Sequence, residues 1–145
     1  MDHQAVAKWA LAGVCVVQGL ATPLLDLNRT HATNPEWPRH ARFHVVWQTF
    51  GVVLLSAVEM ALIFGGWFGG DGGFYLAALL ASLSPVAFLV TVMVRRMFGG
   101  KLSDANGIQP ALLRLGGRVV RVDMNLVAAV VALVSVGVMV VIYRG

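Results

Sequence analysis

The sequence predicts an all-α membrane protein, in which four apolar helices cross the bilayer as one bundle. Of its 145 residues, 58% are hydrophobic and 12% are charged, whereas a soluble domain carries about 25% charged residues. The apolar residues gather in four stretches, at roughly 5–25, 42–66, 74–96 and 121–143. Each stretch has about the twenty residues that a helix needs to cross ~30 Å of hydrocarbon. We therefore expect residues 1–145 to form a single four-span membrane domain.

Basic residues are concentrated on one side of this bundle. Nine of the eleven Lys and Arg residues fall in or beside the first and third connections, and the second connection has none. Because positively charged loops stay in the cytoplasm, we expect loops 1 and 3 to be cytoplasmic and both termini to lie outside. The richness in Val, Ala, Gly and Arg suggests a bacterial inner membrane. The net charge of +4 then reflects topology and contact with anionic headgroups, and no nucleic acid is expected as a partner.

The first span carries a polar stripe along one face. At about 100° per residue, its polar side chains fall together: Gln4, Lys8, Cys15, Gln18, Thr22 and Asp26. Pro23 is expected to bend or end this helix, because proline lacks the backbone donor. Polar groups within a bilayer need partners, so the stripe predicts either interhelical hydrogen bonds or a functional site.

The first connection combines prolines with aromatic residues. The pairs Asn34-Pro35 and Trp37-Pro38 predict a fixed turn, because the residue before a proline avoids the helical region. Tryptophan is common at the headgroup level of the bilayer, and proline suits the first turn of the helix that follows. Asn34 and Trp37 are also candidates for ligand binding.

The second span carries the sharpest functional signal. His40, His44, Gln48, Leu55 and Glu59 fall within an arc of about 100°. Hydrocarbon satisfies none of these polar groups, so we expect the stripe to face the bundle interior or a wet cavity.

The two polar stripes together predict a pocket in the basic half of the bundle. A short connection makes the first two spans antiparallel neighbours, which brings Asp26 and Gln18 toward the two histidines and Gln48. Glu59 lies deeper in the bundle. We expect Lys8 to reach the same level and to pair with the Glu59 carboxylate.

The later spans carry fewer polar groups. Pro85 predicts a kink that frees backbone carbonyls in the third span. The third connection is expected to be long and flexible, with hinges at its glycine pairs and a short interfacial helix near 110–115. The fourth span is expected to begin at Arg118 or Arg121, and one of these arginines is expected to neutralise Asp123.

Several kinds of chemistry compete at the histidines. His40 and His44 have the i, i+4 spacing of some metal sites, and Asp26 and His31 could complete such a set. The surroundings lack the many-histidine sets of membrane di-iron enzymes, so no metal or other cofactor is assigned. Haem is disfavoured because the third and fourth spans lack histidine. An acid–base pocket needs no cofactor: His44 would be the acid or base, Asp26 would stabilise charge, and Glu59 would be a deeper second acid. The ligand-binding candidates are Gln18, Gln48, His40, Trp47, Asn34 and Trp37.

Residues 20–50 also carry a pattern of known type. An Asp-Leu-Asn triplet closes the first span, Pro-x-Trp follows in the connection, and His-Val-Val-Trp-Gln opens the second span. This order resembles the emopamil-binding protein and sigma-2 receptor (EXPERA) family, with Asp26 and Gln48 at the family aspartate and glutamine. His44 stands where sigma-2-like members place a glutamate, if one gap is allowed. The chain is also similar to uncharacterised small bacterial four-span proteins that share the pattern T-H-x-x-N-P-x-W-x-x-H-A-R-F-H, residues 30–44.

The EXPERA resemblance implies a pocket open sideways to lipid that binds sterol-like or isoprenoid molecules. In some relatives a sterol double bond is shifted by adding and removing protons. The leading expectation is therefore a pocket for a hydrophobic small molecule or lipid, with cofactor-free proton-transfer isomerisation as its candidate activity. The alternative is a non-catalytic membrane subunit or ligand-binding module, in which the polar stripe is a helix–helix interface of a homo-oligomer or a complex. A metal site at His40 and His44 is the third expectation.

Overall fold

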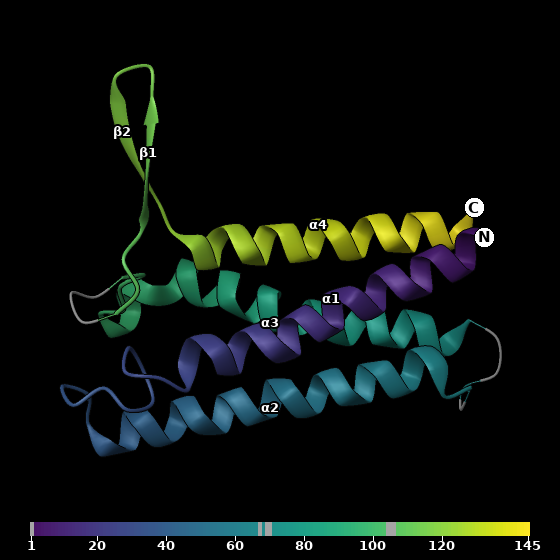
Figure 1. Cartoon of the computed structure of the whole chain (residues 1–145), viewed down its shortest axis with the longest axis horizontal. Coiled ribbons are helices and arrows are strands. Elements are labelled where there is room, and N and C mark those ends of the chain that lie inside the picture. The colour runs from purple at the N-terminus through teal and green to yellow at the C-terminus, as the bar shows by residue number, and fades with distance from the viewer. Residues whose placement is uncertain (1, 67, 69–70, 104–106) are drawn as a thin grey trace.

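Four long helices run side by side along the molecule (Figure 1). The computed structural model describes residues 2–66, 68, 71–103 and 107–145. In chain order the helices are α1 (His3–Asp26), α2 (Arg39–Phe64), α3 (Gly72–Val94) and α4 (Met124–Arg144). Each is long and apolar enough to cross a membrane, which confirms the predicted all-α four-span bundle and fits an integral membrane protein.

The helices are arranged as an antiparallel ring. α1 packs against α2 and α4, and α3 packs against the same two helices from the opposite corner. Both chain termini therefore lie at one end of the bundle (Figure 1). The basic first and third connections lie at the other end, which we call the basic end.

The core occupies the half of the bundle that is nearer the termini. Its residues come from matching levels of all four helices, and they are Ala7, Leu11, Ala12, Cys15, Leu62, Ile63, Phe74, Ala77, Ala78, Ala81, Val136 and Tyr143. Small side chains dominate on α1 and α3, which lets each of these helices pack closely against its neighbours α2 and α4. The basic half holds few buried side chains among the described residues, of which Thr49 is one.

Tyr143 organises the terminal end of the bundle. Its hydroxyl donates a hydrogen bond of 2.8 Å to Oδ1 of Asp71, and its ring stacks on Phe74 with centroids 3.8 Å apart. Lys8 Nζ lies 5.9 Å from the centre of the same ring. Lys8 thus reaches a tyrosine face, and the predicted ion pair with Glu59 does not form.

Pro85 lies inside α3, which continues through it. Since proline has no N–H, the carbonyl of Ala81, four residues earlier, loses its helical donor. Gln18 Nε2 of α1 donates to that carbonyl at 3.0 Å. Gln18 therefore satisfies the group that Pro85 leaves open, and it ties together two helices that otherwise touch little.

A double-mutant cycle tests this pairing. Gln18→Leu is expected to lower the free energy of unfolding by about 1–2 kcal/mol, because it leaves the Ala81 carbonyl without a donor. In a Pro85→Ala background the same change should cost almost nothing, because residue 85 then supplies the missing N–H. Unfolding in mixed micelles with increasing denaturing detergent measures both values. An equal cost in the two backgrounds would contradict the assignment.

Gly19 brings α1 and α2 together near their middle. A Cβ atom at this position would lie 2.7 Å from Ser56 Oγ of α2. The close approach lets Ser56 donate a hydrogen bond of 2.7 Å to the carbonyl of Cys15. Small residues at helix contacts and hydroxyl bonds between helices are the usual means of association inside a bilayer.

The third connection folds differently from the prediction. After the 3-10 turn η1 (Arg95–Phe98), strands β1 (Ala111–Leu115) and β2 (Arg118–Val122) form an antiparallel hairpin where a short interfacial helix was predicted. Gly116 and Gly117 have φ of 53° and 81°, as a two-residue type I′ turn requires. This glycine pair therefore forms the hairpin turn, because two successive positive φ angles suit glycine and few other residues.

The start of α4 also differs from the prediction. The helix begins at Met124, because residues 118–122 belong to β2. Asp123 is its N-cap, and Oδ1 accepts a hydrogen bond of 3.0 Å from the Leu126 N–H. The aspartate thus satisfies a helix N-terminus, and the predicted ion pair with Arg118 or Arg121 does not form.

Candidate functional site

The predicted histidine stripe lies on the outer surface of α2. His40, His44 and Gln48 are exposed, and Trp47 is 64% exposed. The packed face carries a different set: Thr49, Ser56, Glu59, Leu62 and Ile63. The predicted arc therefore straddles the boundary between the two faces, with Glu59 on the inner side. The histidines and Gln48 therefore do not face the bundle interior, which was one of the two surroundings expected for the stripe.

His40 and His44 form a close pair on this surface. Their Nε2 atoms are 3.0 Å apart, so the Nε2–H of one ring donates a hydrogen bond to Nε2 of the other. The centroids of the Trp47 and His44 rings are 5.7 Å apart. No cluster of three His, Cys, Asp or Glu residues that could hold a metal occurs within the described residues, so the predicted metal pair has two ligands on one helix.

Asp26 lies at the basic end of α1, where the first connection folds back on it. His31 Nδ1 is 3.9 Å from Asp26 Oδ1. The His31 and Trp37 rings form an edge-to-face pair, with their centroids 5.2 Å apart. Asn34 is 2% exposed, and its side chain donates to the Thr30 carbonyl at 3.2 Å. Asn34 and Trp37 therefore build the fold of this connection.

Glu59 is the one predicted acid that reaches the core. Its side chain is 1% exposed, and it lies beside the buried thiol of Cys15 on α1. Oε1 has no hydrogen-bond partner within the part of the chain that the structure describes. A carboxyl group in this position costs the fold free energy, and such residues inside bilayers usually serve a function.

The candidate acids and bases are therefore distributed over three places. Glu59 is in the core with Cys15, Asp26 is at the basic end beside His31, and His44 is on the outer face of α2. Gln18, which was expected beside them, points instead to α3. The structure does not bring these residues into one pocket.

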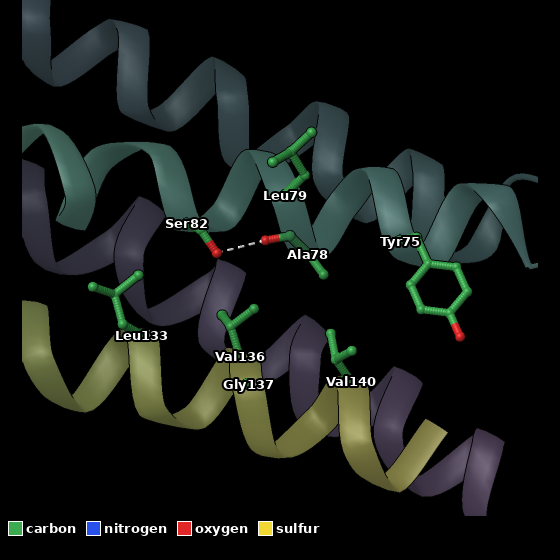
Figure 2. Close-up of a pocket in the computed structure, with 8 residues that line it drawn as sticks. All are labelled: Tyr75, Ala78, Leu79, Ser82, Leu133, Val136, Gly137 and Val140. Atoms are coloured by element: carbon green, nitrogen blue, oxygen red, sulfur yellow. Dashed lines mark hydrogen bonds between the residues drawn. The ribbon is translucent and has the colours of Figure 1, made fainter. Parts of the chain in front are cut away.

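A different hollow lies between α3 and α4 (Figure 2). It is a groove of about 320 Å³, lined from both helices by Tyr75, Ala78, Leu79, Ser82, Leu133, Val136, Gly137 and Val140. The small residues Ala78 and Gly137 create the space. Ser82 Oγ donates to the Ala78 carbonyl at 2.8 Å, so its hydroxyl proton is already used. The groove therefore presents a largely apolar wall.

None of the site residues predicted from the sequence lines this groove. Its only sequence signal is a small residue on each facing helix, and small residues serve equally well for close helix packing. Comparison with protein-family models, with curated proteins and with solved structures finds no match for the chain. The resemblance to the EXPERA family therefore stays a prediction.

Proposed function

We propose that this chain binds an apolar, chain-like molecule, such as a lipid or an isoprenoid, in the groove between α3 and α4. The observation that carries the proposal is the groove itself, an open depression of about 320 Å³ between the two helices. A hollow of this size suits one flexible chain better than a broad, rigid ring system.

The position of the groove supports entry from the bilayer. Leu79 on one wall is 60% exposed, and Gly137 on the other is also exposed. Both surfaces belong to helices that are apolar enough to span a membrane. A ligand dissolved in lipid could therefore enter sideways without crossing water.

The geometry favours binding over catalysis. A general acid or base has to come within hydrogen-bond reach of the atom that gains or loses the proton. None of Asp26, His44 and Glu59 lines the groove. The sequence predicted proton-transfer isomerisation, and this arrangement of the acids and bases does not support it. We therefore propose a protein that binds its ligand without catalysing a reaction.

Filling the groove tests the proposal. Gly137 has open space where a Cβ atom would stand, so Gly137→Leu should occupy the hollow without disturbing the helices. We expect a photoactivatable acyl-chain lipid in nanodiscs to crosslink to α3 and α4 of the wild type. The yield at these helices should fall about tenfold in the variant, a loss of roughly 1.4 kcal/mol of binding.

Gly13→Leu is the matched control. Gly13 also has open space around its Cβ position, but it lies on the exposed side of α1. This variant adds the same side chain to a bilayer-facing surface, and crosslinking to α3 and α4 should remain unchanged. Equal labelling of all four spans, or an unchanged yield in Gly137→Leu, would mean that the lipid merely surrounds the protein.

The outer stripe of α2 favours a second candidate, a helix–helix interface with another copy of this chain. Gln48 is exposed ten residues into α2, and the His40–His44 pair shares this surface. An amide that faces hydrocarbon lacks partners, whereas two such stripes can hydrogen-bond to each other. The oligomeric state of the wild type in nanodiscs tests this candidate, since a stable dimer would favour it.

A further inference from the structure

The hairpin stands apart from the bundle. It projects sideways at the basic end, roughly across the direction of the helices (Figure 1). Only Asp123 separates β2 from the first residue of α4. In a membrane whose normal follows the helices, a segment that leaves the bundle in this direction runs along the bilayer surface.

The two faces of the hairpin differ in character. Residues that pair directly across two strands lie on the same face. The register therefore places Leu113 with Val120, and Ala111 with Val122, on one face that is apolar up to Arg118 at the turn. The opposite face pairs Leu112 with Arg121, and Arg114 with Val119.

An isolated two-stranded hairpin is marginally stable in water at best. Its apolar side chains are uncovered here, with Leu115 61% exposed and Val119 58% exposed. Residues 107–122 contain three arginines and no acidic residue. The hairpin thus needs a partner that offers both apolar contact and negative charge.

We propose that the hairpin is an anchor that lies in the headgroup region of the leaflet at the basic end and binds anionic phospholipid. Leu113 and Val120 enter the acyl boundary, while Arg114, Arg118 and Arg121 contact phosphate groups. Arginine suits this role, since its planar guanidinium binds phosphate through two hydrogen bonds. A second copy of the chain fits less well, because strand pairing would bring two sets of the same arginines together.

Hydrogen exchange of the full-length protein tests the proposal. We compare nanodiscs of phosphatidylcholine alone with nanodiscs that also contain phosphatidylglycerol, at one protein copy per disc. Amides of residues 112–121 should exchange about a hundredfold more slowly with the anionic lipid, because each arginine near the surface contributes roughly a factor of five. Exchange of the four spans should not change, and ~1 M salt should remove most of the effect.

Three sets of substitutions separate charge from structure. Changing Arg114, Arg118 and Arg121 together to Gln should abolish the slowing, whereas changing them together to Lys should preserve most of it. The matched control replaces Arg29, Arg39 and Arg96 with Gln, which removes the same charge from exposed positions at the same end, and it should retain the slowing.

Two results would overturn the proposal. One is equal exchange with and without phosphatidylglycerol in the wild type, which would leave the anionic lipid without a role. The other is protection that appears only with two copies per disc, which would assign the hairpin to strand pairing between copies.

Discussion

Replacing Gly73 with alanine is expected to lower the free energy of unfolding by about 1–3 kcal/mol, because one methyl group overpacks a tight helix contact. A Cβ atom at this position would collide with the backbone carbonyl oxygen of Leu62 on α2. A backbone oxygen cannot rotate away as a side chain can, so α2 and α3 would have to separate where Phe74 stacks on Tyr143. Detergent-induced unfolding of the purified protein measures the effect.

The neighbouring glycine provides the control. Among the described residues, a Cβ at Gly72 would meet only Phe68 Cβ, at the ordinary distance of 3.5 Å. Both substitutions gain the same helix propensity, roughly 1 kcal/mol for alanine over glycine, so their difference isolates the collision. If Gly72→Ala and Gly73→Ala were equally stable, the close contact between α2 and α3 would be refuted.

Glu59→Met is expected to act in the opposite direction and to raise the free energy of unfolding by about 1–3 kcal/mol. The change removes a 1% exposed carboxyl, whose Oε1 lacks a partner among the described residues, and it replaces the group with an apolar side chain of similar length. Among the described residues, the substitution loses the contact between the carboxyl group and the neighbouring Cys15 thiol. The same unfolding assay gives the value.

Ser56→Ala is the companion variant one turn away on α2. Ser56 donates a hydrogen bond to the Cys15 carbonyl, so its loss should lower stability by roughly 0.5–1.5 kcal/mol. Opposite signs for the two variants would mean that Ser56 serves the fold, whereas Glu59 is retained for another purpose. A loss of stability in Glu59→Met would instead make the carboxyl a structural group.

The spans follow from the sequence because a bilayer allows few alternatives to an apolar helix. The hairpin does not, since the stretch from Leu112 to Val122 reads equally well as a helix end or a strand. Gly116-Gly117 between two runs of Leu, Val and Arg is a hairpin signal, but a glycine pair is equally typical of a flexible hinge. The predicted start of α4 is too early for the same reason, because residues 118–122 belong to β2.

The candidate site depends on which helix face meets which neighbour, and helical spacing alone does not contain this information. His44 and Glu59 fall within one arc of α2, yet the packed face begins between them. Gln18 was expected either to bond between helices or to line a pocket, and the open carbonyl created by Pro85 decides for the bond. The groove depends on how α3 and α4 are rotated about their axes relative to each other. The sequence of either helix alone does not determine this orientation.

Native mass spectrometry of the protein released from lipid nanodiscs tests the central claim, that the α3–α4 groove holds an apolar chain. We expect one adduct of lipid mass on the wild type, retained by Gly13→Leu and lost by Gly137→Leu. A bare wild-type chain would contradict it, as would an adduct that all three proteins carry equally. A bare dimer would contradict it too, and would favour the α2 interface instead.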